Sequence, residues 1–222
     1  MIRWTKLAAA QAPGGGELRL MQRGAEFSIM IGGEELMNSR RGGSETALGA
    51  LTCERLRERT APHLLIGGLG LGFTLRAALG ELGPQARITV AELVPEVVDW
   101  ARGPLSEVFQ GSLDDPRVHI ALADVAALIE AAGSTYDAIL LDVDNGPAGL
   151  VSAGNDGLYG QAGLSRAHRA LRPGGVLAVW SAGPDAAFVR RMQATEFAVE
   201  DLTVRSAGRS GARHVIWIAR RP

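Results

Sequence analysis

Three glycines at alternating positions, Gly68, Gly70 and Gly72, separate a short apolar run from a segment whose apolar residues recur at helical spacing. Glycine adopts positive φ angles and lets a ligand approach the backbone closely. A helix that begins near Gly72 would direct unpaired N–H groups and the positive end of its dipole at this turn. We therefore predict a strand, a tight turn and a helix that together hold an anionic or electron-rich ligand.

The spacing of these glycines distinguishes two classes of nucleotide site. A dinucleotide turn has the pattern G-x-G-x-x-G, but here the third glycine comes one residue early and Phe73 stands where that pattern needs a small residue. The G-x-G-x-G pattern instead resembles the first motif of class I S-adenosylmethionine-dependent transferases. Alone it is a weak signal, because glycine-rich turns also serve simply to bring a helix close to a sheet.

Acidic residues come at the ends of three predicted strands. Glu92 ends the second strand, Asp124 follows the third and Asp142 follows the fourth. Ligands of open α/β sheets bind beyond the carboxyl ends of the strands, so we expect these side chains at one site. Glu92, with Leu93 beside it, would accept hydrogen bonds from ribose hydroxyls, and Asp142 would lie nearest the reactive end of the nucleotide.

Asp124 has two compatible roles. Its carboxylate can accept a hydrogen bond from an adenine amine while Val125 donates its backbone N–H to the base. It can also be the N-cap of the helix that begins at Val125. Glu92 likewise has a plainer interpretation, a solvated charge at a strand end, but the glycines before it argue for a nucleotide contact.

The elements that position these residues alternate between strand and helix. Strands are predicted at 63–66, 87–91, 118–122, 136–141 and 175–180, and helices at 72–82, 95–102, 124–132, 157–171 and 185–195. Such alternation indicates a parallel sheet with helices on both faces and right-handed crossovers. The segments AVEDLTVR and HVIWIAR would end the sheet as a hairpin. The predicted fold is α/β, with a Rossmann-like sheet of seven strands, as the class I methyltransferase resemblance also implies.

The first 38 residues follow a different pattern. Turn residues separate the segments ELRLMQ, EFSIMI and EELMN, which predicts a small β-meander that acts as a lid or docking sheet. Gly42 and Gly43 form a hinge, and a helix is predicted from Ser44 to about Arg59. We therefore divide the chain into a meander at residues 1–42 and a nucleotide-binding transferase domain at residues 43–222.

The composition argues against several classes of function. A net charge of −1 and a pI near 6.4 give no basic footprint for nucleic acid or anionic membranes. The single cysteine, Cys53, allows no internal disulfide, and the four scattered histidines leave no zinc-ligand spacing. The apolar stretch from Leu7 to Ala10 is too short for a signal peptide or a membrane span. We expect a cytoplasmic protein that binds no nucleic acid, membrane or metal.

A narrower resemblance, to the polyamine synthases (the spermidine and spermine synthases), is carried by five segments in order: LLIGGLGLGFTLRAAL, ITVAELVPEVVDWAR, DPRVHIALADVAALI, YDAILLDVDNGP and LRPGGVLAVWS. It covers nearly the whole chain, because the meander and the helix GSETALGAL are compatible with it. The resemblance implies nucleotide contacts from Gly68, Gly70, Glu92 and Asp124, and a role for Asp142 in deprotonating the attacking amine. It also implies a possible homodimer, for which the meander offers a docking surface.

Three positions depart from the pattern of that family. Leu71 stands where the family has an aspartate that contacts the aminopropyl amine of the donor, Asn145 replaces a second acidic residue after the fourth strand, and Gly43 replaces a tyrosine. Each missing group would bind a cationic amine, and a charge-assisted contact contributes about 1.5–3 kcal/mol. The departures favour methyl transfer slightly over aminopropyl transfer.

Other side chains are weaker candidates for the acceptor site. Asp144 and Asp156 could partly restore an acidic pocket, and Tyr159 could face the acceptor cavity, although turn formation explains Asp144 and helix packing explains Tyr159 equally well. Trp180 could close the site with its ring, but core packing is the stronger expectation. His214 lies within a predicted strand and is expected to be structural.

The sequence thus predicts an enzyme that transfers a group from a sulfonium to an amine or hydroxyl of a small-molecule acceptor. The cofactor would be S-adenosylmethionine, its decarboxylated form or methylthioadenosine. Asp142 would orient or deprotonate the acceptor, with Asn145 as its hydrogen-bonding neighbour. Two alternatives stay open, an aminopropyltransferase of the spermidine synthase type and a catalytically silent nucleotide-binding homologue. A dehydrogenase ranks third.

Overall fold

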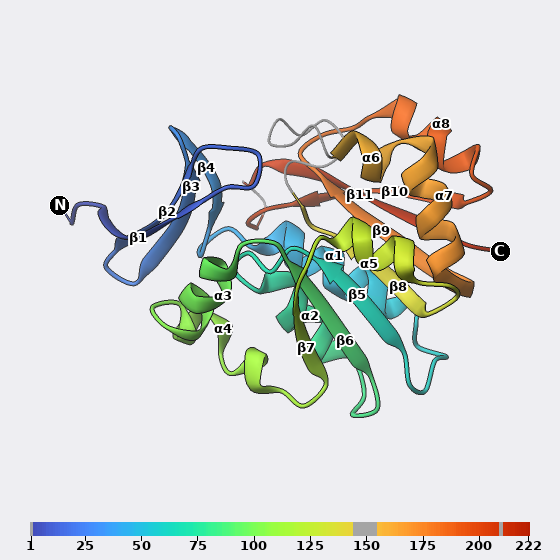
Figure 1. Cartoon of the computed structure of the whole chain (residues 1–222), viewed down its shortest axis with the longest axis horizontal. Coiled ribbons are helices and arrows are strands. Elements are labelled where there is room, and N and C mark those ends of the chain that lie inside the picture. The colour runs from blue at the N-terminus through green and yellow to red at the C-terminus, as the bar shows by residue number, and fades with distance from the viewer. Residues whose placement is uncertain (1, 144–154, 209–210) are drawn as a thin grey trace.

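The computed structural model describes residues 2–143, 155–208 and 211–222 as two sheets, the larger of which is covered by helices (Figure 1). The smaller sheet is an antiparallel meander in the order β1-β2-β3-β4. Its strands are β1 (Thr5–Gln11), β2 (Glu17–Arg23), β3 (Glu26–Ile31) and β4 (Glu34–Asn38). The predicted meander is present, with β1 as an additional strand. The sequence did not indicate β1 because its alanine run lacks the β-branched residues typical of strands.

The larger sheet has the strand order β10-β11-β9-β8-β5-β6-β7. Its strands are β5 (His63–Gly67), β6 (Arg87–Glu92), β7 (Val118–Leu122), β8 (Tyr136–Leu141), β9 (Leu171–Ser181), β10 (Ala198–Arg205) and β11 (Arg213–Arg220). β5 to β9 run parallel, and β11 is antiparallel to both β9 and β10. This topology confirms the predicted α/β sheet of seven strands. Because β5 lies between β6 and β8, the order of the strands reverses there and a crevice opens beyond their carboxyl ends.

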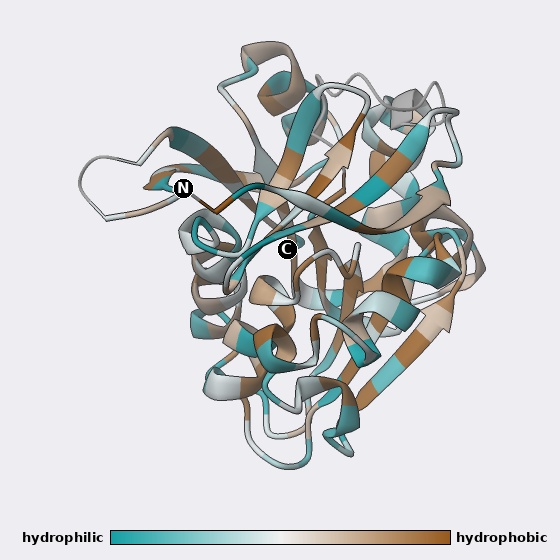
Figure 2. Ribbon diagram, turned by 90° about the vertical axis from the view of Figure 1, so that its left-hand side faces the viewer, coloured by the Kyte–Doolittle hydropathy of each residue, from teal (hydrophilic) through white to brown (hydrophobic). Residues whose placement is uncertain are grey.

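Helices cover both faces of this sheet. They are α1 (Gly43–Glu54), α2 (Phe73–Glu81), α3 (Pro95–Arg102), α4 (Ser106–Phe109), α5 (Val125–Ala131), α6 (Asn155–Tyr159), α7 (Gln161–Ala170) and α8 (Ala186–Gln193), with a short 3-10 helix at Ser112–Asp114. Alternate strand residues enter different cores: Leu64 and Ile66 of β5 pack in the core with α1, α2 and α3, whereas Leu65 packs in the core with α5, α7 and α8. Bands of alternating hydropathy are visible along several strands in Figure 2.

Three predicted boundaries were wrong. Helix α1 ends at Glu54, and the chain turns at Arg55 so that Leu56 enters the core. The predicted helix 157–171 is two helices, because Gly160 between them is extended, with φ of −73° and ψ of 170°. Strand β9 begins at Leu171, and an irregularity in its pairing with β8 precedes Val176. Tertiary packing decides such boundaries, so local pattern alone does not fix them.

The meander stands beside the carboxyl ends of the central strands (Figure 1). Residues of β2, β3 and β4, among them Leu18, Ile29 and Leu36, line the same cavity as the turn that follows β5. The meander therefore covers the cavity at the carboxyl ends of the central strands of the larger sheet. Across the described ranges, no helix is long and apolar enough to span a membrane.

Candidate active site

The turn between β5 and α2 forms one wall of the cavity, and its three glycines all have positive φ. Gly68, Gly70 and Gly72 have φ of 90°, 51° and 73°. A Cβ atom on Gly68 would lie 2.5 Å from the backbone carbonyl oxygen of Asp142, and one on Gly72 would lie 2.5 Å from the ring of Phe109. The glycines thus let the turn pack directly against Asp142 and Phe109. They also leave its backbone accessible to a ligand.

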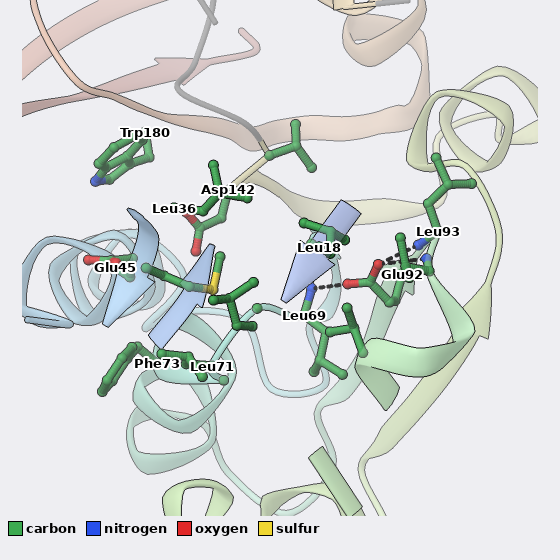
Figure 3. A pocket seen from close by; sticks show the side chains of 18 of the residues that line it. Leu18, Leu36, Glu45, Leu69, Leu71, Phe73, Glu92, Leu93, Asp142 and Trp180 are labelled. Carbon is green, nitrogen blue, oxygen red and sulfur yellow. Dashed lines mark hydrogen bonds between the residues drawn. The ribbon is translucent and has the colours of Figure 1, made fainter. Parts of the chain in front are cut away.

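Glu92, at the end of β6, ties this turn to the neighbouring strand (Figure 3). One carboxylate oxygen accepts the backbone N–H of Leu69 at 3.1 Å, and the other accepts those of Leu93 and Val94, each at 2.8 Å. Burial raises the pKa of Glu92, and the backbone hydrogen bonds oppose that effect. A carboxylate has about four acceptor positions, so Glu92 retains acceptor capacity for a ribose hydroxyl.

Asp124 is the N-cap of helix α5, which was one of the two roles predicted for it. Its Oδ1 accepts the backbone N–H of Ala126 at 2.8 Å. The side chain is exposed, and it lines the cavity together with Val125. Leu93 also lines this end of the cavity and is 50% exposed, which provides an apolar surface of the kind that a purine ring covers.

Asp142, directly after β8, lies with Glu45 of α1 at the other end of the cavity (Figure 3). The Thr74 hydroxyl donates to Asp142 Oδ2 at 2.8 Å and also lies 3.2 Å from the backbone carbonyl of Glu45. Burial, with the negative charge of Glu45 as a second cause, raises the pKa of Asp142 to about 7, while the Thr74 hydrogen bond opposes the rise. A carboxyl group that titrates near neutral pH is suited to accept a proton during catalysis.

The raised pKa of Asp142 makes stability depend on pH. The folded protein holds this proton up to about pH 7, whereas the ordinary pKa is 3.8. Between these values the unfolded chain binds fewer protons, so we expect the contribution of Asp142 to the free energy of unfolding to fall as the pH rises from about 4 to 7. Asp142→Asn removes this dependence. In urea denaturation the variant should gain more over the wild type at pH 8 than at pH 5, and an equal difference would contradict the raised pKa.

The cavity between the glycine turn, the acid pair and the meander has a volume of about 500 Å³. It is lined by the eight residues predicted to contact the nucleotide: Gly68, Gly70, Gly72, Glu92, Leu93, Asp124, Val125 and Asp142. The structure therefore brings all eight of these residues to one cavity. Their contacts with a nucleotide stay predictions.

The residues predicted to contact the acceptor are not found on the described wall of the cavity. Tyr159 packs in the core on the α5, α7 and α8 side, where its ring meets that of Phe188 edge-on at 5.7 Å between centroids. It is not among the residues that line the cavity, so helix packing was the better interpretation. Asp144 and Asn145 lie outside the described residues, as does the side chain of Asp156.

Two residues of the cavity wall were given another role, and a third residue, which hydrogen-bonds to the wall, was missed. Trp180, at the end of β9, and His214, at the start of β11, stack with 4.9 Å between ring centroids and both line the cavity, although core packing and a structural role were expected. The position of Trp180 at the carboxyl end of a parallel strand was the signal that could have found it. Thr74, the hydrogen-bond partner of Asp142, lies in the first turn of α2 and carried no comparable signal. No cluster of metal-ligating side chains occurs within the described part of the chain.

Residues 54–190 match the family described as the spermine/spermidine synthase domain. The chain belongs to this family. The resemblance recognised in the sequence is thereby confirmed for more than half of the chain. Among relatives in the spermine/spermidine synthase family, polyamine aminopropyltransferase 2 of Pseudomonas aeruginosa is 38% identical over 120 residues, which is 52% of this chain and 32% of the relative. Polyamine aminopropyltransferase of Mycobacterium tuberculosis is 32% identical over 127 residues, which is 56% of this chain and 23% of the relative.

The matched segment therefore spans about a third or less of the length of these two relatives. Among solved structures, spermidine synthase from Thermotoga maritima superposes with a TM-score of 0.78 at 18% identity, covering 100% of this chain and 75% of that one. This similarity supports the spermidine synthase fold for the whole described chain, meander included.

Proposed function

We propose that this protein transfers an aminopropyl group from decarboxylated S-adenosylmethionine to an amine. Family membership and relatives named as polyamine aminopropyltransferases support aminopropyl transfer better than methyl transfer, which Leu71, Asn145 and Gly43 had slightly favoured. The observation that carries the proposal is the Glu45–Asp142 acid pair beside the glycine turn, at the edge where the strand order reverses.

The residues of the cavity fit a nucleoside with a cationic substituent. The volume of about 500 Å³ lies within the range of small-molecule sites. Glu92 and Asp124 would hold the ribose and the adenine, and Leu93 would pack against the base. The acid pair would lie at the end that receives the sulfonium and the acceptor amine, where negative side chains stabilise positive charge.

Asp142 would accept one proton from the ammonium group of the acceptor, which frees the nitrogen lone pair. The nitrogen then forms a bond to the propyl carbon, and the carbon–sulfur bond breaks with its electron pair going to the sulfur. The products are a neutral thioether nucleoside and a secondary ammonium. The sulfonium is intrinsically activated, so the protein contributes alignment, charge stabilisation and removal of the proton.

The donor can be tested by calorimetric titration of the purified protein with S-adenosylmethionine and, in parallel, with its decarboxylated form. The two differ by one carboxylate, which would meet the charges of Glu45 and Asp142. We expect the decarboxylated form to bind at least about tenfold more tightly, a difference of about 1.4 kcal/mol. Glu45→Gln removes one of the two charges and should narrow the preference. Equal affinities, or tighter binding of the intact form, would contradict the proposal.

A further inference from the structure

The hydroxyl of Thr74 joins three elements of the structure at the Asp142 end of the cavity. Thr74 is the second residue of α2 and is 3% exposed. Its Oγ1 lies 2.8 Å from Asp142 Oδ2, just after β8, and 3.2 Å from the backbone carbonyl oxygen of Glu45 in α1. Both of these bonds lead away from the helix to which Thr74 belongs.

Backbone packing fixes the distance between Thr74 and Asp142. A Cβ atom on Gly49 of α1 would lie 2.7 Å from the backbone carbonyl oxygen of Thr74, so α1 and α2 touch at this residue. The turn before α2 is held as closely, because a Cβ atom on Gly68 would lie 2.5 Å from the backbone carbonyl oxygen of Asp142. The hydroxyl is therefore held beside the carboxyl group from both sides.

The Thr74 hydroxyl can bond to Asp142 in either protonation state. A hydroxyl has one proton and two acceptor positions, whereas a carbonyl oxygen only accepts. When Asp142 is ionised, Thr74 donates to Oδ2, and a bond to a charged oxygen is the stronger of its two choices. When Oδ2 carries a proton, it donates to Thr74 Oγ1, and the proton of Thr74 turns to the carbonyl of Glu45. A proton on Oδ1 instead leaves the first arrangement unchanged.

We propose that Thr74 is a positioning residue of the transfer reaction, because its hydroxyl holds the Asp142 carboxyl group in one orientation before and after that group takes the acceptor proton. This inference rests on the proposed function for its catalytic meaning. Thr74 is not among the residues that line the cavity, so it acts through Asp142 and not on the substrates. The ionised carboxylate, which must receive the proton, gains the stronger bond.

Charged groups on several elements surround Asp142. Burial and then the negative charge of Glu45 in α1 raise the pKa of Asp142, and the Thr74 hydrogen bond opposes the rise. The other titratable or charged side chains on the described wall of the cavity are Glu35, Arg41, Glu92, Asp124 and His214. Substitutions of Thr74 leave all of these groups in place. A difference between variants that keep and lose the hydroxyl therefore reports the hydroxyl.

Infrared titration of Asp142 tests the inference without turnover. The carbonyl band of the protonated carboxyl group is assigned by its loss in Asp142→Asn and followed from about pH 4 to about pH 9. Valine has nearly the shape of threonine without the hydroxyl, so the midpoint in Thr74→Val should rise by about one pH unit. Thr74→Ser keeps the hydroxyl and should titrate like the wild type. Thr74→Ala removes the hydroxyl with a smaller side chain and gives the same test if the valine variant does not fold.

Thr52→Val is the matched control. Thr52 is fully buried in α1, and its hydroxyl donates to the backbone carbonyl of Leu48 at 2.7 Å without lining the cavity. This variant also removes a buried hydroxyl bonded to a backbone carbonyl, but it should leave the midpoint of Asp142 unchanged. An unshifted midpoint in the Thr74 variants that lack the hydroxyl, or an equal shift in Thr52→Val, would overturn the inference.

The pH profile of kcat/KM for the transfer gives a second readout. A rise of one unit from about 7 lowers the ionised fraction of Asp142 at pH 7 about fivefold. We expect kcat/KM of Thr74→Val to fall at least that much at pH 7, with its rising limb moved to higher pH, and Thr74→Ser to restore both. An unmoved limb would contradict the role of Thr74. A shifted infrared midpoint in folded protein that binds the donor but transfers no group would support the Thr74 bond and contradict the transfer reaction.

Discussion

Asp142→Asn is expected to lower the rate of transfer by ~10²–10⁴-fold, the usual contribution of a positioned general base. The asparagine side chain has nearly the same shape and can still accept the hydrogen bond of Thr74, so the cavity should keep its form. It cannot take the proton of the acceptor ammonium. Donor affinity, measured by calorimetry, should change much less than the rate, because the residues proposed to contact the ribose and the adenine lie at the other end of the cavity.

The control for this variant is Asp201→Asn on β10, which removes an exposed carboxylate that does not line the cavity. It should retain the wild-type rate. The pH dependence gives an independent check, since the rate of the wild type should rise as Asp142 loses its proton near pH 7. A folded Asp142→Asn protein with the wild-type rate would show that another group accepts the proton.

Gly68→Ala is expected to lower both the free energy of unfolding and the rate of transfer. The alanine Cβ would lie 2.5 Å from the carbonyl oxygen of Asp142, and the φ of 90° is strained for any residue with a side chain. We expect a loss of about 2–5 kcal/mol in the free energy of unfolding, the sum of the backbone strain and the overlap. In a chain of this size each kcal/mol lowers Tm by about 2–4 °C. The backbone at Asp142 must also shift, so the rate of transfer should fall.

Gly80→Ala is the matched control for this second variant. Gly80 lies within α2, is exposed and has nothing within 4 Å of the position of a Cβ. In a helix, alanine is favoured over glycine by about 0.5–1 kcal/mol, so this variant should be slightly more stable than the wild type. Thermal unfolding of both variants tests whether Gly68 is needed for the close packing of the turn. A Gly68→Ala protein as stable as Gly80→Ala would contradict that packing.

The larger sheet was predictable because its periodicity is strong. Buried strands such as β5 and β8 are short apolar runs, and the helices between them repeat apolar residues at helical spacing. β1 and the break at Gly160 were not predictable. The alanines of β1 become a strand by pairing with β2, a contact between segments that no local pattern encodes.

The convergence of the residues proposed to contact the nucleotide was predictable for a physical reason. Glu92, Asp124 and Asp142 come at the carboxyl ends of parallel strands, and the topology brings such ends together. The opposite end of the cavity, where the acceptor is proposed to bind, depends on contacts between segments that are far apart in the sequence. Trp180 meets His214 because β11 runs antiparallel to β9, and Glu45 lies near Asp142 because α1 packs against β8. These two contacts determine which side chains meet at that end of the cavity.

The central claim is that the protein transfers the aminopropyl group, and not the methyl group, of decarboxylated S-adenosylmethionine. A donor labelled in both groups tests this claim most directly. Decarboxylated S-adenosylmethionine would carry ¹³C in its propyl carbons and deuterium in its methyl group. The protein would be incubated with this donor and with an amine acceptor, either 1,4-diaminobutane or n-hexylamine. Mass spectrometry then shows which group reaches the nitrogen. We predict an amine that carries the ¹³C-labelled aminopropyl group, with the deuterated methyl left on the thioether nucleoside. An amine that carries the deuterated methyl group, or no transfer by folded protein that binds the donor, would contradict the account.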